Sequence, residues 1–247
     1  MPAPSSEPSA HRFATTAWSI VVRASGSDPA ARPALEDLSR AYWYPLYAYH
    51  RRRGAAAAEA EDAVQSFFAH LLEKNIVRYA DPNRGRFRGF LVTAFRQFLA
   101  KRNEYESAGK RRPAGIMFSI DAVAGEARYS AELSDTETPD RLFEYTWAVA
   151  TLDRAMTRLR GEQETEGKAD RFRALQGTLT GQATATHAEL AAGLGMSEGA
   201  IRVQIHRLRQ RFAQFVREEV AATLGEGESV DEELRTLLTA LRSGGPA

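Results

Sequence analysis

The stretch HAELAAGLGMSEGAIRVQIHRLRQRF, residues 187–212, decides the fold of this chain. Its first part predicts a short apolar helix over residues 187–192. Gly195 then stands where the chain must turn sharply, and glycine tolerates the positive φ angle that such a turn often needs. Ser197 is a favoured N-cap for a second helix, because its hydroxyl accepts a hydrogen bond from a free backbone N–H. This order predicts a helix-turn-helix motif.

The second helix of the motif has two chemically different faces. At helical spacing its apolar face carries Ile201, Ile205, Leu208 and Phe212. An opposite face of arginine, glutamine and histidine fits the major groove of B-DNA, where arginine can read guanine and glutamine can read adenine. The competing interpretation is a surface helix whose arginines are merely solvated. The candidate DNA-binding residues are Ser197, Arg202, Val203, His206, Arg207, Arg209 and Arg211.

Helical spacing of apolar residues recurs through the rest of the chain, without strand alternation or a repeat of fixed period. Pro45 should kink or interrupt the helix that begins at Pro33. The sequence therefore predicts an all-α chain with two helical domains. The expected helices outside the motif are 33–53, 55–75, 87–106, 142–160, 172–179 and 230–242.

Charge divides the chain into segments, although the total is only +1, from 33 Lys and Arg against 32 Asp and Glu. Residues 33–112 carry a net charge of +6 and residues 113–145 a net charge of −5. Clustered basic charge is typical of a protein that binds a phosphate backbone, although solvated helix faces would give the same pattern. We expect an N-terminal extension over 1–32, a helical domain over 33–112, an acidic linker with little regular structure over 113–141, a helix-turn-helix domain over 142–222 and an acidic C-terminal extension over 223–247.

Composition also excludes several classes of protein. The chain has no cysteine, which rules out disulfides, thiolate metal sites and cysteine nucleophiles. It has no run of about 18 apolar residues that could span a membrane. The first 12 residues lack the layout of a signal peptide, so we expect a cytoplasmic protein. His206 has no second histidine at ligand spacing, and we predict neither a metal site nor a cofactor.

The helix expected around residues 58–74 has an apolar stripe that suffices for packing, and an outer polar face without an evident structural task. The outer residues are Asp62, Gln65, Ser66 and Glu73. The plain interpretation is a routine exposed face; the alternative is a surface that docks on a partner protein.

The stretch 84–102, RGRFRGFLVTAFRQFLAKR, mixes basic residues with phenylalanines. Such mixtures suit single-stranded nucleic acid, because rings stack on bases and cations hold phosphates. Most of the phenylalanines fall at helical spacing, so we expect them in the core. The candidate contacts are instead Arg84, Arg86, Arg88, Arg96, Gln97 and Lys101.

The order of these parts resembles the sigma-70 family of bacterial RNA polymerase sigma factors, of the small extracytoplasmic-function type. AEDAVQSFF, residues 60–68, is similar to the AED-x-x-Q-x-x-F motif of the family's region 2. FRGFLVTAF, residues 87–95, resembles its F-x-x-W-L-x-x-I-A motif, and LAAGLGMSEGAIRVQIHRLRQRF, residues 190–212, resembles its region 4 helix-turn-helix. The resemblance covers about residues 34–217.

The resemblance implies a non-catalytic subunit that binds core RNA polymerase and recognises promoter DNA. The outer face of 58–74 would dock on the polymerase, the candidates in 84–102 would contact the −10 element, and the helix-turn-helix would contact the −35 element. An anti-sigma factor or another regulatory protein is a further candidate partner. The chain departs from the family at Phe90, where tryptophan is usual, and at Gln97 and Lys101, where asparagine and aspartate are usual.

Two other functions compete with this interpretation. A free-standing helix-turn-helix regulator would explain residues 187–216 equally well, but not AEDAVQSFF or the basic–aromatic helix. An enzyme would need catalytic groups, and the sequence shows no GxxxxGK phosphate loop, no HExxH and no cysteine. A regulatory hypothesis concerns the acidic C-terminal extension, whose carboxylates could shield the arginine face of the helix-turn-helix.

Overall fold

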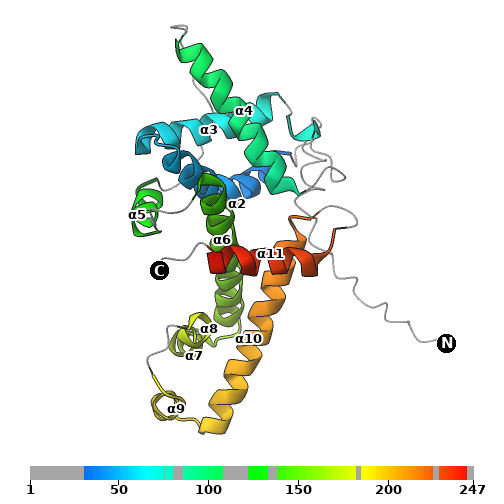
Figure 1. The fold of residues 1–247 in the computed structure, drawn as a ribbon. Coiled ribbons are helices and arrows are strands. Elements are labelled where there is room, and N and C mark those ends of the chain that lie inside the picture. The colour runs from blue at the N-terminus through cyan, green and yellow to red at the C-terminus, as the bar shows by residue number, and fades with distance from the viewer. Residues whose placement is uncertain are drawn as a thin grey trace, which may run out of the picture.

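The computed structural model describes residues 31–74, 76–79, 86–107, 122–132, 138–181, 185–224 and 228–243. The described residues form helices and turns and contain no strand, which confirms the expected all-α class. Figure 1 shows the order of the helices along an elongated molecule. They are α2 (Ala31–Arg52), α3 (Ala57–Glu73), the 3-10 helix η1 (Ile76–Tyr79), α4 (Phe87–Ser107), α5 (Ala122–Glu132), α6 (Pro139–Thr165), α7 (Ala169–Leu175), α8 (Gly177–Thr180), α9 (His187–Leu194), α10 (Glu198–Ala221) and α11 (Val230–Ser243).

Helices α2, α3 and α4 pack together at one end of the molecule (Figure 1). Helix α2 runs through Pro45 without interruption, which the sequence did not lead us to expect. The buried aromatic residues around the proline explain this, because Tyr42 and Tyr47 are each 1% exposed. Their burial stabilises a helix in which proline removes one backbone hydrogen bond.

Helix α6 connects the two ends of the molecule. It begins at Pro139, after Thr138, whose hydroxyl accepts a hydrogen bond from the N–H of Arg141. The first turns of α6 bury Phe143 and Trp147 against the α2 end. The later turns run beside α10 (Figure 1). A single helix therefore takes part in both halves of the molecule.

The segment 113–141, expected to be a linker with little regular structure, contains helix α5 and the start of α6. The expectation of an irregular linker is therefore wrong for residues 122–132. Helix α5 lies against α2, where Arg51 donates hydrogen bonds from Nε and Nη2 to the Glu126 carboxylate at 3.0 and 2.8 Å. The hydroxyl of Tyr47 donates to the same carboxylate.

Helix α11 packs on α6 and α10 near the middle of the molecule (Figure 1). Its leucines are buried only in part: Leu237 is 2% exposed, whereas Leu238 is 51% exposed. Within the described residues, no helix is long and apolar enough to cross a membrane.

Candidate nucleic-acid interface

Helices α9 and α10 form the expected helix-turn-helix. Thr186 and Glu189 make a reciprocal capping box at the start of α9. Gly195 ends α9 with a φ of 63°, and the Ser197 hydroxyl accepts a hydrogen bond from the N–H of Ala200 at 3.2 Å. The glycine turn and the serine cap are thus confirmed. The hydroxyl of Ser197 is engaged at the cap that orients the first turn of α10.

The inner face of α10 holds the motif together. Ile201 is fully buried, and Ile205 and Leu208 are 3% and 6% exposed. Phe212 is only half-buried. Most of the expected apolar face is therefore confirmed, and its burial turns the opposite face of the helix outward.

The outer face of α10 offers an apolar centre beside unpaired cationic and polar groups. Val203 is 49% exposed, and His206 and Arg207 are exposed without a hydrogen bond or ion pair to any described residue. Arg202 pairs only with Glu198, one turn earlier, at 3.3 Å, and both side chains are more than half exposed. Exposed pairs of this kind contribute little stability, so a ligand can displace them at small cost.

Arg209 and Arg211, two other candidates on α10, bind groups of the same chain. Arg209 donates a hydrogen bond to the carbonyl oxygen of Thr178 at 3.0 Å. Arg211 donates from Nε to both oxygens of Glu162, at 2.8 and 3.0 Å, and its guanidinium lies 4.2 Å from the Phe215 ring centre. The hydrogen bond to Glu162 raises the pKa of Arg211. In this arrangement Arg211 ties α10 to α6 and does not face outward.

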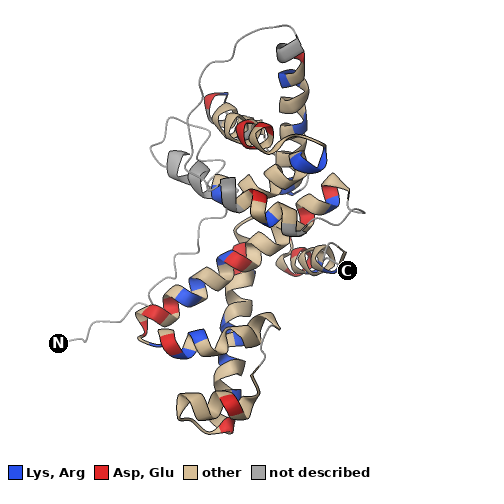
Figure 2. Ribbon diagram, turned by 90° about the vertical axis from the view of Figure 1, so that its left-hand side faces the viewer, with Lys and Arg blue, Asp and Glu red and all other residues tan. Residues whose placement is uncertain are grey.

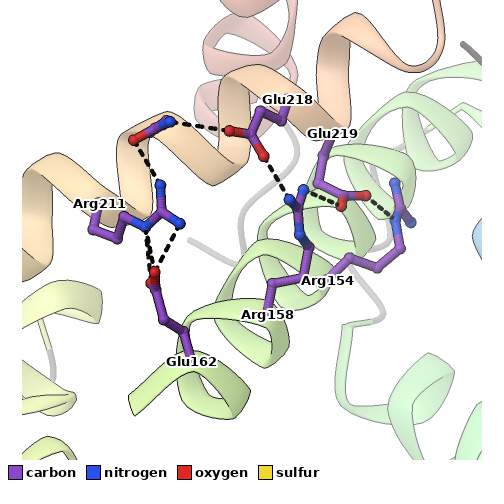
Figure 3. Close-up of polar contacts among 7 residues, drawn as sticks. Arg154, Arg158, Glu162, Arg211, Glu218 and Glu219 are labelled. Atoms are coloured by element: carbon purple, nitrogen blue, oxygen red, sulfur yellow. Dashed lines mark hydrogen bonds and ion pairs between the residues drawn. The ribbon is translucent and has the colours of Figure 1, made fainter. Parts of the chain in front are cut away.

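Figure 3 shows that Arg211 belongs to a polar network between α6 and α10. Glu219 accepts hydrogen bonds from Arg154 at 2.9 Å and from Arg158 at 3.1 Å. Arg158 also lies over the Phe215 ring, 4.4 Å from its centre. Figure 2 shows acidic and basic segments interleaved over the molecule. Part of the arginine excess on α10 is therefore matched by carboxylates of the same chain.

On α3, the candidate docking residues lie off the buried stripe. Asp62 is 59% exposed and pairs with Arg102 of α4 at 3.0 Å. Gln65 is half-buried and donates to Glu61 at 3.2 Å. Ser66 is half-buried and Glu73 is exposed. The four residues share one helix, and in the described part of the chain Gln65, Ser66 and Glu73 make no hydrogen bond or ion pair with another helix.

The apolar side of α3 is the predicted one. Val64 and Phe67 are fully buried, and Phe68 and Leu71 are 1% and 2% exposed. The side chain of Leu72 lies outside the described residues. The predicted packing side of α3 is confirmed wherever the structure describes it.

At the start of α4, the candidate −10 contact Arg88 faces the interior of the protein. Arg88 is 5% exposed and donates from Nε to both oxygens of Glu144, at 2.7 and 3.0 Å. Its guanidinium lies 4.3 Å from the centre of the Trp147 ring. Burial lowers the pKa of Arg88. That Arg88 contacts DNA stays a prediction; in this arrangement its side chain leaves little surface for a phosphate.

Glu233 of α11 pairs with both Arg86 and Arg88. It is 1% exposed, its Oε2 atom lies 2.9 Å from Nε of Arg86, and its Oε1 atom pairs with Arg88. Arg86 also donates to the hydroxyl of Thr236 at 3.0 Å. Neither oxygen of Glu233 accepts a hydrogen bond of good geometry. The carboxylate is therefore held by charge more than by directed bonds.

The remaining candidates on α4 differ among themselves. Arg96 donates to the hydroxyl of Tyr49 at 2.8 Å and pairs with Asp140. Gln97 and Lys101 are exposed. Arg84 lies outside the described residues. Of the five candidates that the structure describes, Gln97 and Lys101 are thus exposed without an internal partner.

Sequence reasoning missed the internal partners of the arginines, above all Glu233 and Glu144. Glu233 stands four residues before Leu237 and three after Val230, so it lies on the apolar stripe of α11. An acidic residue on an apolar stripe is the signal that could have identified a buried ion pair. The hypothesis that the acidic extension shields the arginine face of α10 is not supported, because α11 lies away from the turn between α9 and α10 (Figure 1).

No family model matches this chain, and neither the curated proteins nor the solved structures contain a match. Among the described residues, no group of three or more histidine and carboxylate side chains is placed to hold a metal ion.

Proposed function

We propose that this chain is a sigma-type initiation subunit that binds core RNA polymerase and directs transcription from specific promoters. The observation that carries the proposal is the outer face of α10, where Val203, His206 and Arg207 are exposed on a helix set by a glycine turn and a serine cap. A face of this shape and chemistry suits the major groove.

Helices α3 and α4 support a sigma-type subunit over a protein that only binds DNA. Helix α3 presents Asp62, Gln65, Ser66 and Glu73 on the side away from its core, which suits docking on the polymerase. Helix α4 presents Gln97 and Lys101, which suit contact with a melted −10 element. The subunit would be non-catalytic, and capturing an unstacked base would cost a few kcal/mol that phosphate contacts offset.

The direct test is run-off transcription with purified core polymerase and promoter fragments selected from genomic DNA. We expect specific transcripts only when core polymerase and the chain are both present. Arg207→Ala should reduce them, and Arg141→Ala, which removes an exposed arginine of α6 remote from α9, serves as the control. Transcription that is equally specific without the chain would overturn the proposal.

The second candidate is a free-standing helix-turn-helix regulator. One observation favours it: the outer face of α10 is exposed in the isolated chain, whereas Arg86 and Arg88 are paired internally. A regulator would bind duplex DNA specifically without core polymerase and would not bind the core in a pull-down. A sigma-type subunit would bind the core through α3 and gain promoter affinity from it.

A further inference from the structure

We propose that α11 is an internal latch whose Glu233 carboxylate occupies the anion-binding position formed by Arg86 and Arg88, in competition with nucleic-acid phosphates. The inference rests on the proposed function, because it concerns the access of nucleic acid to Arg86 and Arg88, two of the candidate −10 contacts. It differs from a shield over the helix-turn-helix: the latch occupies Arg86 and Arg88 at the start of α4 and leaves the outer face of α10 open.

The first argument is the position of the carboxylate. Glu233 reaches Arg86 and Arg88 from a helix at the far end of the chain, and Thr236 adds a hydroxyl to the same arginine. Two guanidinium groups and a hydroxyl around one carboxylate resemble the donor set that holds a phosphate oxygen. A phosphate and Glu233 therefore cannot occupy this position together.

The second argument is the balance of forces on Glu233. At 1% exposure, the carboxylate has lost its hydration, and neither oxygen accepts a hydrogen bond of good geometry. A buried ion pair with incomplete hydrogen bonding contributes little net stability, because desolvation offsets the attraction. The contact thus specifies where α11 docks while leaving the docked state open to competition from a polyanion.

The third argument is that the arginines differ in how they would be released. Arg88 keeps Glu144 and Trp147, both on α6, when α11 leaves. Arg86 is 36% exposed even with α11 docked, and its two side-chain partners among the described residues, Glu233 and Thr236, both belong to α11. Release of α11 therefore frees Arg86 for phosphate contact without dismantling the packing of α6 on α2.

Besides its apolar packing on α6 and α10, α11 makes an exposed ion pair with α10. Arg217 of α10 donates to Asp231 at 2.7 Å, and the two side chains are 52% and 63% exposed. Salt screens such a pair, whereas the buried pair is screened much less. Glu233 is accordingly the residue that distinguishes a latch from a helix attached by general electrostatic attraction.

The test compares Glu233→Gln with Glu232→Gln. Glu232 is an exposed neighbour on the same helix, so both variants lose one negative charge but only one loses the buried pair. The natural chain has no cysteine, so labels can be placed at Ala100→Cys on α4 and Thr239→Cys on α11, both exposed. Energy transfer between the labels reports undocking of α11 without DNA or polymerase.

We expect Glu233→Gln to raise the undocked population by roughly tenfold and Glu232→Gln to leave it unchanged. The affinity for a single-stranded oligonucleotide of mixed sequence should rise in parallel for Glu233→Gln. Adding Arg86→Ala to Glu233→Gln should abolish that gain in affinity. Helix content and thermal unfolding would be followed in the same samples. If Glu233→Gln does not fold, Glu233→Asp keeps the charge on a shorter side chain and should undock α11 partially.

Two outcomes would overturn the latch: α11 that stays docked in both Glu233 variants, or α11 that undocks without a gain in oligonucleotide affinity. Either is distinguishable from failure of the proposed function. Run-off transcription with core polymerase tests that function separately, and its absence would leave the opening of α11 and the gain through Arg86 intact.

Discussion

Arg211 and Glu162 join the second helix of the motif to the helix that runs along the molecule, with two hydrogen bonds from one Nε atom at 2.8 and 3.0 Å. The sequence predicts that Arg211 contacts DNA, whereas in the structure it makes a contact within the protein. Arg207 lies four residues earlier, on the outer face of the same helix, and has no described partner. Substituting each arginine in turn therefore separates an effect on stability from an effect on DNA recognition.

Arg211→Ala should destabilise the protein by roughly 1 kcal/mol, since it removes a partly exposed ion pair and the stacking on Phe215. Because Arg211 is 36% exposed, solvent screening keeps the effect modest. Urea unfolding checks the value. A variant of unchanged stability but reduced base preference would instead return Arg211 to the DNA-binding set.

Arg207→Ala should have the opposite profile. If Arg207 reads a base, the substitution costs about 1–3 kcal/mol of binding free energy and relaxes preference at one position of the −35 element. Stability should change by less than about 0.5 kcal/mol, because the side chain is exposed and unpaired. Binding to a library of −35 duplexes measures both effects. Unaltered affinity and preference would remove Arg207 from the interface.

The docking surface on α3 can be tested without disturbing the core. Gln65→Ala with Glu73→Arg should weaken pull-down of core polymerase and reduce transcription, while the free energy of unfolding stays within about 0.5 kcal/mol of the natural chain. Asp62 is less suitable as a target, because it pairs with Arg102, which is only 8% exposed. Glu164→Arg, an exposed position on α6, is the control for added positive charge. Core binding at the natural level in the double variant would contradict docking through this face.

The contact of α5 with α2 depends on a glycine. A Cβ atom at Gly125 would lie 2.8 Å from Cζ3 of Trp43, and the Trp43 ring is stacked on Tyr47 with centroids 5.0 Å apart. Gly125→Ala should therefore destabilise the protein by about 1–3 kcal/mol and increase hydrogen exchange in 122–132. Gly161→Ala is the matched control, because a Cβ atom there meets open space, near the C-terminal end of α6. Helix propensity predicts that this control stabilises the protein by about 0.5–1 kcal/mol.

The same contact should respond to acid. Hydrogen bonds from Arg51 and Tyr47 lower the pKa of Glu126 below its ordinary value of 4.5. A carboxyl group whose pKa is lower in the folded state contributes stability above the ordinary pKa, and loses it as the pH falls through the folded-state pKa. The protection factors of the α5 amides, exchange rates corrected for intrinsic pH dependence, should therefore fall below about pH 4.5, and Glu126→Gln should flatten that dependence. An identical pH profile in natural and variant proteins would show that another group controls the docking of α5.

The helix-turn-helix could be predicted because its determinants are local. Gly195 supplies the positive φ angle, and Ser197 caps the helix that begins at the next residue by accepting from the N–H of Ala200, so neighbouring residues decide the geometry. The stripe of α3 is predictable for the same reason, since helical spacing alone identifies its buried side. Pro45 shows the limit of local rules: the burial of the aromatic residues around it maintains the helix.

The unpredicted features depend on residues far apart in the chain. Arg88 and Glu144 are 56 positions apart, and nothing near Arg88 distinguishes it from a basic side chain that faces DNA. Arg211 and Glu162 are 49 positions apart, so the sequence near Arg211 likewise predicts a DNA contact and gives no sign of its internal partner. Net charge by segment therefore indicated basic surfaces, part of which the chain neutralises with its own carboxylates. Which arginines remain free is a property of tertiary packing.

The continuity of α6 also fixes an angular relationship. Its 27 residues span about 40 Å at 1.5 Å per residue, and each residue turns the helix by about 100°. Because its first turns are anchored on α2 and its later turns on α10, the outer face of α10 has a set rotation relative to α4. One residue inserted in mid-helix would turn one surface by about 100° relative to the other. The length of this helix thus sets the phase between the two surfaces, much as the helical repeat of DNA sets the phase between two sites on a duplex.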